Sequence, residues 1–178
     1  MHQQDRLFVV VSGPPGSGKT TVARPLAEAL GLPLIRKDAI KEALGEAMGA
    51  PDYETSHRLG AVTMQVLRGL MRDIGFGVYD SPWRPQFDLP DLARLPPPLV
   101  EVFCDCDPVV RLQRIHDRRG TRHPVHFDLE HAAASAQGDP ADHPLGGPWP
   151  LIRVDTTGAV AITELAGQVR RAARSARR

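Results

Sequence analysis

The sequence has few of the features that mark an oxidised, membrane-bound or nucleic-acid-coating protein. Its 178 residues include only two cysteines, Cys104 and Cys106, which are one residue apart and cannot cross-link distant segments. Disulfide-rich small domains belong to oxidising compartments, so we expect this protein to lie in the reducing cytoplasm. The early apolar run from Leu7 to Val11 is far shorter than the roughly 20 residues that cross a bilayer, and no small-residue cleavage site follows it. We therefore expect no contact with a membrane.

An excess of charge of one sign is also lacking. Lys and Arg number 22 against 21 Asp and Glu, so the net charge is +1, which argues against coating nucleic acid through bulk positive charge. The seven histidines form no pair at metal-ligand spacing, and no internal repeat or low-complexity block divides the chain. We expect one globular domain that spans residues 1–178.

Hydrophobic patterns predict strands that alternate with helices. Residues 7–12 form a continuous run rich in β-branched side chains, which is typical of a strand buried on both faces. Strands are expected at 7–12, 32–36, 77–80, 99–104 and 151–154, and helices at 19–30, 39–48, 53–74, 108–118, 129–137 and 159–173. The proline-rich stretches 81–98 and 139–150 are expected to be loops. Strands separated by helices predict an α/β fold whose parallel sheet is covered by helices on both faces.

Residues 13–20, Gly-Pro-Pro-Gly-Ser-Gly-Lys-Thr, match the phosphate-binding pattern G-x-x-x-x-G-K-[ST] in full. They follow a predicted strand and open a predicted helix, where glycines let backbone N–H groups converge on phosphate oxygens. We expect Lys19 to reach the β- and γ-phosphates of ATP and Thr20 to ligate Mg²⁺. The expected nucleotide-binding residues are Gly13, Pro14, Pro15, Gly16, Ser17, Gly18, Lys19, Thr20, Thr21, Arg114 and Thr156. The alternative is a plain glycine-rich turn before a helix.

Two carboxylates follow neighbouring predicted strands. Asp38 comes just after the second strand and Asp80 ends the third. Because the carboxyl ends of parallel strands line the ligand crevice, Asp38 can accept the proton of an attacking hydroxyl and Asp80 can hold Mg²⁺ with Thr20. The alternatives are that Asp38 only caps the next helix and that Asp80 only begins a turn before Pro82.

Arginines gather after the fourth predicted strand. Arg111, Arg114 and Arg118 share a helix face, and Arg119 and Arg122 continue into a loop around Gly120. Guanidinium groups stabilise the charge that spreads over a transferred phosphoryl group, so we expect an Arg-rich lid at about residues 116–138. The expected catalytic residues are Lys19, Asp38, Arg118, Arg119 and Arg122. The alternative for these arginines is a solvated helix face.

In these residues the chain resembles the P-loop kinases of the polynucleotide 5′-kinase, zeta-toxin and chloramphenicol phosphotransferase group, and small bacterial AAA-type ATP-binding proteins. The resemblance covers nearly the whole chain and is carried by residues 13–20, by Lys37-Asp38 with Lys41, by 80–83 and by 118–124. It implies a three-layer P-loop NTPase with a five-stranded parallel sheet in the order 2-3-1-4-5, ATP and Mg²⁺ as cofactors, and transfer to a hydroxyl. It also implies that Asp38 is the base and that the basic residue at 41 holds an acceptor phosphate.

The chain departs from that group where the acceptor would bind. Pro82-Trp83-Arg84-Pro85 replaces the usual polar turn, and Lys41 replaces an arginine that would grip phosphate with two donors. The expected acceptor-binding residues are Lys41, Arg58, Trp83 and Arg84, with Phe87 as a further candidate. The alternative for Trp83 is a ring that covers the core.

Three functions fit these patterns. The first is an ATP-dependent kinase for the hydroxyl of a small molecule, such as an antibiotic or a nucleoside-like compound. The second is a polynucleotide 5′-hydroxyl kinase, for which the arginine-rich tail 170–178 could bind a strand, although arginines in a last helical turn also complement the helix dipole. The third is a nucleotide-binding switch or slow ATPase, which needs no base at Asp38; no guanine-reading N-K-x-D pattern is present. A monomer and a homodimer both remain open.

Overall fold

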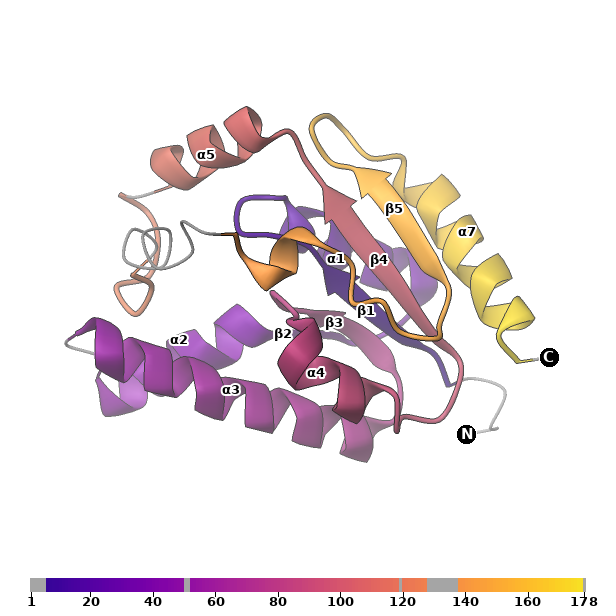
Figure 1. The fold of residues 1–178 in the computed structure, drawn as a ribbon, viewed down its shortest axis with the longest axis horizontal. Helices are drawn as coiled ribbons and strands as arrows, with labels where there is room; N and C mark the ends of the chain where they lie inside the picture. Colours follow the sequence, from indigo (N-terminus) through magenta and orange to yellow (C-terminus); the bar gives the residue numbers. More distant parts are fainter. Residues whose placement is uncertain (1–5, 50–51, 119, 128–137, 178) are drawn as a thin grey trace.

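A parallel sheet forms the centre of the computed structural model, which describes residues 6–49, 52–118, 120–127 and 138–177 (Figure 1). Its strands are β1 (Phe8–Ser12), β2 (Leu34–Arg36), β3 (Gly77–Asp80), β4 (Leu99–Asp105) and β5 (Leu151–Asp155). They lie in the order β2-β3-β1-β4-β5, and each neighbouring pair is parallel. The predicted fold class and strand order are confirmed.

Helices cover both faces of this sheet. They are α1 (Lys19–Leu30), α2 (Lys37–Met48), α3 (Tyr53–Ile74), α4 (Pro85–Leu92), α5 (Pro108–Asp117) and α7 (Ile162–Ser175), with a short 3₁₀ helix η2 (Pro140–Asp142) before β5. Figure 1 shows α3 and α4 on one side of the sheet and α1 and α7 on the other. In the described part of the chain, no helix is both long and apolar enough to cross a membrane.

The central strand β1 is buried on both faces, as its uninterrupted apolar run predicts. Phe8 and Val10 pack in a core cluster with Leu67 of α3, while Val9 and Val11 pack in the cluster that contains α1 and α7. Alternating side chains of one strand thus join the two cores. Because both faces are fixed, the carboxyl end of β1 delivers the following loop to a defined place.

The proline-rich stretch 81–98 is not wholly a loop, so that prediction was wrong. Residues 85–92 form α4, with Pro85 in its first turn, where a missing N–H costs nothing. The buried Asp88 accepts a hydrogen bond from the backbone N–H of Arg84 at 2.7 Å and forms an ion pair with Arg68 of α3. The bond to Arg84 closes the first turn of the helix locally, and the tertiary contact with Arg68 adds a stabilisation that the local sequence does not reveal. The helix expected at 129–137 lies outside the described residues.

One carboxylate is buried within the sheet. Glu101 of β4 is only 1 % exposed, and its Oε1 accepts hydrogen bonds from Ser12 Oγ at 2.6 Å and from the backbone N–H of Leu145 at 3.0 Å. Its Oε2 accepts a bond from Trp149 Nε1 at 3.3 Å. Several donors are what a buried carboxylate requires, so Glu101 fastens the segment before β5 to the last residue of β1.

Replacing Glu101 with alanine should destabilise the protein by about 3 kcal/mol, because it leaves buried donors unpaired and opens a cavity. Urea unfolding followed by circular dichroism measures this loss. Glu28→Ala, on the exposed side of α1, is the matched control and should change the free energy of unfolding by less than about 0.5 kcal/mol. A similarly small change for Glu101→Ala would show that these hydrogen bonds contribute little.

Candidate active site

The loop between β1 and α1 has the backbone that its glycines predict. Gly13, Gly16 and Gly18 have φ values of 131°, 79° and 82°, in the region that side chains rarely adopt. Space is also lacking, because a Cβ atom at Gly13 would lie 2.6 Å from Cys104 O, and one at Gly16 would lie 2.7 Å from Arg111 O. The loop is therefore closely packed against β4 and α5, and its curl depends on glycine.

This loop is built to accept an anion. Gly18 precedes α1 without a side-chain cap, and the first turn of α1 holds no acidic residue, so the helix itself supplies no negative charge at the positive end of its dipole. Ser17 Oγ is buried and has no hydrogen-bond partner among the described residues. An orphaned hydroxyl at the uncapped N-terminus of a helix fits the phosphates of a nucleotide.

Lys19 lies over the loop. Its Nζ donates hydrogen bonds to Gly13 O at 2.7 Å and Pro14 O at 2.8 Å. Burial lowers the pKa of Lys19, and the negative charge of Asp80 opposes that effect. The ammonium group is therefore held inside the curve of the loop, where the sequence pattern predicts phosphate.

Thr20 and Asp80 meet across the site, although 60 residues separate them in the sequence. Thr20 Oγ1 donates a hydrogen bond to Asp80 Oδ2 at 2.5 Å. Burial raises the pKa of Asp80, while the nearby Lys19 ammonium opposes the shift. A hydroxyl and a carboxylate side by side are the oxygen ligands that Mg²⁺ prefers, so these residues fit the metal that accompanies a nucleotide.

Asp80→Asn should raise the Mg²⁺ concentration needed for half-maximal activity by about tenfold or more, because an amide binds a divalent cation more weakly than a carboxylate. The stability of Asp80→Asn at neutral pH should not fall below that of the wild type. Folding raises the pKa of Asp80, so its ionised form destabilises the folded wild type at a pH above that pKa, and the neutral amide removes this cost. Activity against Mg²⁺ and a melting curve test both points, with Asp73→Asn on the exposed side of α3 as control. An unchanged Mg²⁺ requirement would remove Asp80 from the metal site.

Asp38 lies in the first turn of α2 and is paired with two cations. Its Oδ2 is 3.2 Å from Arg122 Nη2 and its Oδ1 is 3.4 Å from Lys37 Nζ. Burial alone would raise the pKa of Asp38, but Lys37 and Arg122 together hold it well below the usual range for a carboxyl. The helix is preceded by Arg36 and has no side-chain cap, so Asp38 does not serve as its N-cap. The carboxylate is thus ionised and oriented.

Arg114 and Thr156 connect the phosphate loop to the loop after β5. Arg114 Nη2 donates to Thr156 O at 3.0 Å and to Thr157 O at 3.2 Å. The buried Thr156 hydroxyl lies 2.6 Å from Ser17 O and 2.7 Å from Asp105 O. These contacts fix the relative positions of three segments around the rim of the phosphate loop.

The structure brings two of the three predicted lid arginines to the site. Arg118 follows the last turn of α5, and its positive charge contributes to the lowered pKa of Lys19. Arg122 contacts Asp38, with its Nη2 atom 3.2 Å from Asp38 Oδ2. Arg119 lies outside the described residues.

The predicted acceptor residues are not gathered around Asp38. Lys41 is buried and donates a hydrogen bond to Ser56 Oγ at 2.7 Å. Arg58 has a side chain 71 % exposed and pairs with Glu54 within α3. In this arrangement Lys41 is enclosed by α2 and α3 and Arg58 pairs within its own helix, so neither charge is directed at Asp38.

The other two predicted acceptor residues also have structural contacts. Trp83 is 1 % exposed and packs in the core cluster beneath α3 and α4, so the alternative of a ring that covers the core is what the structure shows. Arg84 Nε lies 3.8 Å from Asp139 Oδ1, and the Arg84 side chain remains about one-third exposed at 32 %. Phe87 is largely exposed on α4. Of these predicted residues, Arg84 keeps a polar group near solvent.

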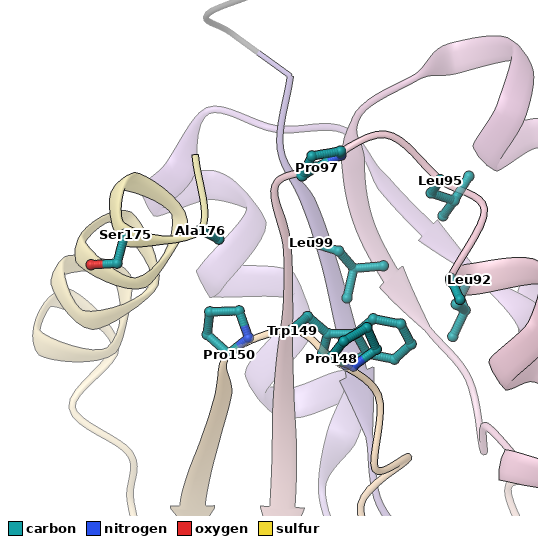
Figure 2. A pocket seen from close by; sticks show the side chains of 10 residues that line it. Leu92, Leu95, Pro97, Leu99, Pro148, Trp149, Pro150, Ser175 and Ala176 are labelled. Atoms are coloured by element: carbon teal, nitrogen blue, oxygen red, sulfur yellow. The ribbon is translucent and has the colours of Figure 1, made fainter. Parts of the chain in front are cut away.

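A cavity of about 570 Å³ lies at the amino-terminal ends of β4 and β5, far along the sheet from the phosphate loop. Figure 2 shows its apolar side chains around Trp149 and Leu99. It is lined by Leu92, Ala93, Leu95, Pro97, Leu99, Pro148, Trp149, Pro150, Ser175 and Ala176. None of the predicted site residues lines this cavity, so it is separate from the candidate active site.

Two packing features of the structure were not predicted, although the sequence contains hints of them. Gly45 interrupts an otherwise good helix-forming segment, which usually has a packing reason. Glu101 is a single charge inside an apolar strand, which requires buried partners. Neither hint identifies the partner, because each partner is distant in the sequence.

Comparison with known proteins agrees with this geometry. A family model described as an AAA domain matches residues 8–139. A crystal structure from Chloroflexus aurantiacus J-10-fl, with a provisional assignment as a kinase, is 29 % identical, covers 95 % of this chain and 99 % of that one, and has a TM-score of 0.81. A gluconokinase from Sinorhizobium meliloti 1021 is 20 % identical, covers 96 % and 94 % of the two chains, and has a TM-score of 0.61, which supports the fold. The cytidylate kinase of Pyrobaculum aerophilum is 49 % identical over 52 residues, or 29 % of this chain and only 28 % of that protein.

Proposed function

The chain belongs to the AAA domain family, and from that membership we propose that it is an ATP-dependent kinase that phosphorylates a hydroxyl group of a small molecule. The observation that carries the proposal is the convergence of three groups at one end of the sheet. These are the phosphate loop with Lys19, the Thr20–Asp80 pair and the carboxylate of Asp38. A nucleotide-binding switch needs the first two groups but not the third.

Each residue has a stated role in this proposal. The N–H groups of the loop and the Lys19 ammonium bind the phosphates, and Thr20 and Asp80 would hold Mg²⁺. ATP, when bound, supplies the phosphoryl group. Asp38 orients the acceptor hydroxyl and takes its proton on a carboxylate oxygen as the new O–P bond forms and the bond to the departing ADP breaks. Arg118 lies where it can stabilise charge near Lys19.

The low pKa of Asp38 indicates what the carboxylate contributes most. A carboxylate held below its usual pKa is a weak base, so it removes little of the barrier by early proton abstraction. Phosphoryl transfer has a loose transition state in which the attacking oxygen keeps its proton until late, and positioning then dominates. Asp38 is therefore proposed chiefly to aim the hydroxyl.

The arginine-rich tail supports a small acceptor over a nucleic-acid strand. Arg170 Nη2 donates to Ala29 O at 2.6 Å, and Arg177 Nη2 donates to Arg6 O at 2.9 Å. These side chains satisfy backbone carbonyls at the end of α1 and before β1, which is a structural use of their charge. We propose that the chain works as one domain. Of the expected lid at residues 116–138, residues 119 and 128–137 lie outside the described residues. Membership of the polynucleotide 5′-kinase, zeta-toxin and chloramphenicol phosphotransferase group is part of the same proposal.

Transfer of label from [γ-³²P]ATP to a panel of acceptors tests the function. The panel should contain polyols and hydroxy acids such as gluconate, nucleosides, hydroxyl-bearing antibiotics, cytidylate and 5′-hydroxyl oligonucleotides. We expect a labelled small hydroxyl compound, with Asp80→Asn reducing the yield. Labelling of cytidylate on its phosphate would overturn the alcohol acceptor, and oligonucleotide labelling that falls steeply with salt would favour the strand kinase. ATP hydrolysis without any acceptor labelling would favour the switch.

A further inference from the structure

The described loop after α5, residues 120–127, lies along one face of α2. Three acidic residues recur every fourth position on that face, so they form a ladder one helical turn apart. Each meets a basic residue of the loop: Asp38 with Arg122 at 3.2 Å, Glu42 with His126 at 3.0 Å, and Glu46 with His123 at 3.6 Å. Burial lowers the pKa of His126. The loop therefore has a fixed register on α2.

Val125 anchors this loop by its backbone and its side chain. The Val125 carbonyl accepts a hydrogen bond from Ser56 Oγ of α3 at 2.6 Å, and Ser56 Oγ accepts one from Lys41 Nζ. The Val125 side chain is 2 % exposed and lies against Gly45 of α2, where a Cβ atom would be 2.7 Å from Val125 Cγ2 and 3.0 Å from Val125 Cβ. The missing side chain of Gly45 thus creates the notch that Val125 fills.

The connection from Val125 to Arg122 is short and internally bonded. The backbone N–H of Val125 donates to His123 Nδ1 at 3.1 Å, and that of His126 donates to His123 O at 3.0 Å. The backbone N–H of Arg122 donates to Arg118 O at 3.0 Å, which joins the turn to the end of α5. A shift of Val125 must therefore be carried to Arg122.

We propose that Val125, seated in the Gly45 notch, is a positioning residue that holds Arg122 against Asp38 and so sets the aim of the Asp38 carboxylate. The inference rests on the proposed function, in which Asp38 receives the acceptor hydroxyl. Val125 and Gly45 touch no reacting group and act only through Arg122. The charged and titratable groups that face Asp38 are Lys37, Arg122, His126, Lys19 and Asp80.

Gly45→Ala is the direct test, because a methyl group in the notch must displace Val125. We expect kcat to fall roughly 10- to 100-fold, since small misplacements of a catalytic group have effects of that size, with KM for ATP unchanged within about twofold. The acidic limb of the rate profile should move to higher pH, because Asp38 loses a cation partner. Gly60→Ala on α3 is the matched control, since a methyl group there meets nothing within 4 Å.

A second substitution supplies rescue. In Gly45→Ala, the further change Val125→Ala removes the contact at 2.7 Å and leaves one at 3.0 Å that a small shift relieves. We expect the double variant to be about threefold or more faster than Gly45→Ala alone, the non-additivity typical of residues in contact. Equal or lower activity would overturn the proposal. Should Gly45→Ala fail to fold, Val125→Ala alone is the test, because it adds no atom. It must show a smaller fall in kcat and a smaller shift of the pH profile in the same directions; if it shows neither, the proposal is wrong.

A measurement without substrate separates this inference from the proposed function. The ¹³C resonance of the Asp38 carboxyl is followed against pH in the nucleotide-free protein. In the wild type it should stay at its ionised position down to the lowest pH at which the protein remains folded, and in Gly45→Ala its midpoint should move up toward 3.8, the ordinary value. An unchanged titration would overturn the positioning role. A shifted titration in a protein that phosphorylates no acceptor would overturn the proposed function alone.

Discussion

Lys19→Ala is expected to lower phosphoryl transfer by about a thousandfold or more, because it removes the cation that would bind the phosphates at the point where charge develops. The fold should persist. Lys19 is buried with a lowered pKa, so its charge is costly in the folded state, and removing that cost offsets the loss of its hydrogen bonds to the loop. Transfer from labelled ATP and a thermal melt measure the two effects.

Arg24→Ala is the matched control for Lys19→Ala, because it removes one positive charge from the exposed side of the same helix. It should leave transfer unchanged. If Lys19→Ala kept its turnover, the loop would not be the phosphate site. If it unfolded at a much lower temperature than the wild type, Lys19 would be a structural residue of the loop.

Asp38→Asn is expected to lower kcat by about 10²- to 10⁴-fold while the affinity for ATP stays nearly constant. The amide keeps the shape of the carboxylate but lacks the charge that aims the acceptor hydroxyl and finally takes its proton, and it no longer attracts Arg122. Folding lowers the pKa of Asp38, so the ionised carboxylate stabilises the protein at any pH above its ordinary pKa, and this stability is lost as the pH falls through the folded-state pKa. Asp38→Asn lacks this contribution and should be slightly less stable at pH 7. Single-turnover rates and nucleotide titrations provide the measurements.

Asp73→Asn, on the exposed side of α3, controls for the loss of a carboxylate elsewhere. If Asp38→Asn kept wild-type rates, Asp38 would have only a structural role in the first turn of α2. The proposed kinase would then have no assigned group that receives the acceptor hydroxyl. A large loss of ATP affinity would instead place Asp38 in the nucleotide site. The two outcomes contradict the proposal in different ways, because one removes the acceptor role and the other relocates it.

The fold was predictable because its strongest patterns are local. An apolar run, then a glycine-rich loop, then a helix define β1, the phosphate loop and α1 with no knowledge of distant contacts. The prediction failed at α4, where prolines suggested a loop and the contact of Asp88 with the distant Arg68 favours a helix. Local preference there is weaker than tertiary contacts.

The candidate site was predictable in its phosphate half and not in its acceptor half. Thr20 follows from the phosphate-binding pattern, and Asp80 follows from the strand-end rule, which applies to any parallel sheet. Lys41 and Trp83 were misplaced because the direction in which a side chain is buried depends on packing that no local pattern encodes. The contact between Arg122 and Asp38 joins residues 84 positions apart, and chain spacing says nothing about such a pair.

The carboxylate of Glu101 also limits how the chain can be divided. The AAA domain match ends at residue 139, yet two of the donors to Glu101 come from Leu145 and Trp149. A fragment cut at the end of that match would lose both of these donors and leave the buried carboxyl group short of hydrogen-bond partners, directly beside the strand that leads into the phosphate loop. The smallest unit that folds on its own therefore extends at least through Trp149. Proteolytic cleavage between residues 140 and 149 should disturb the phosphate loop at the other end of the hydrogen-bonded chain.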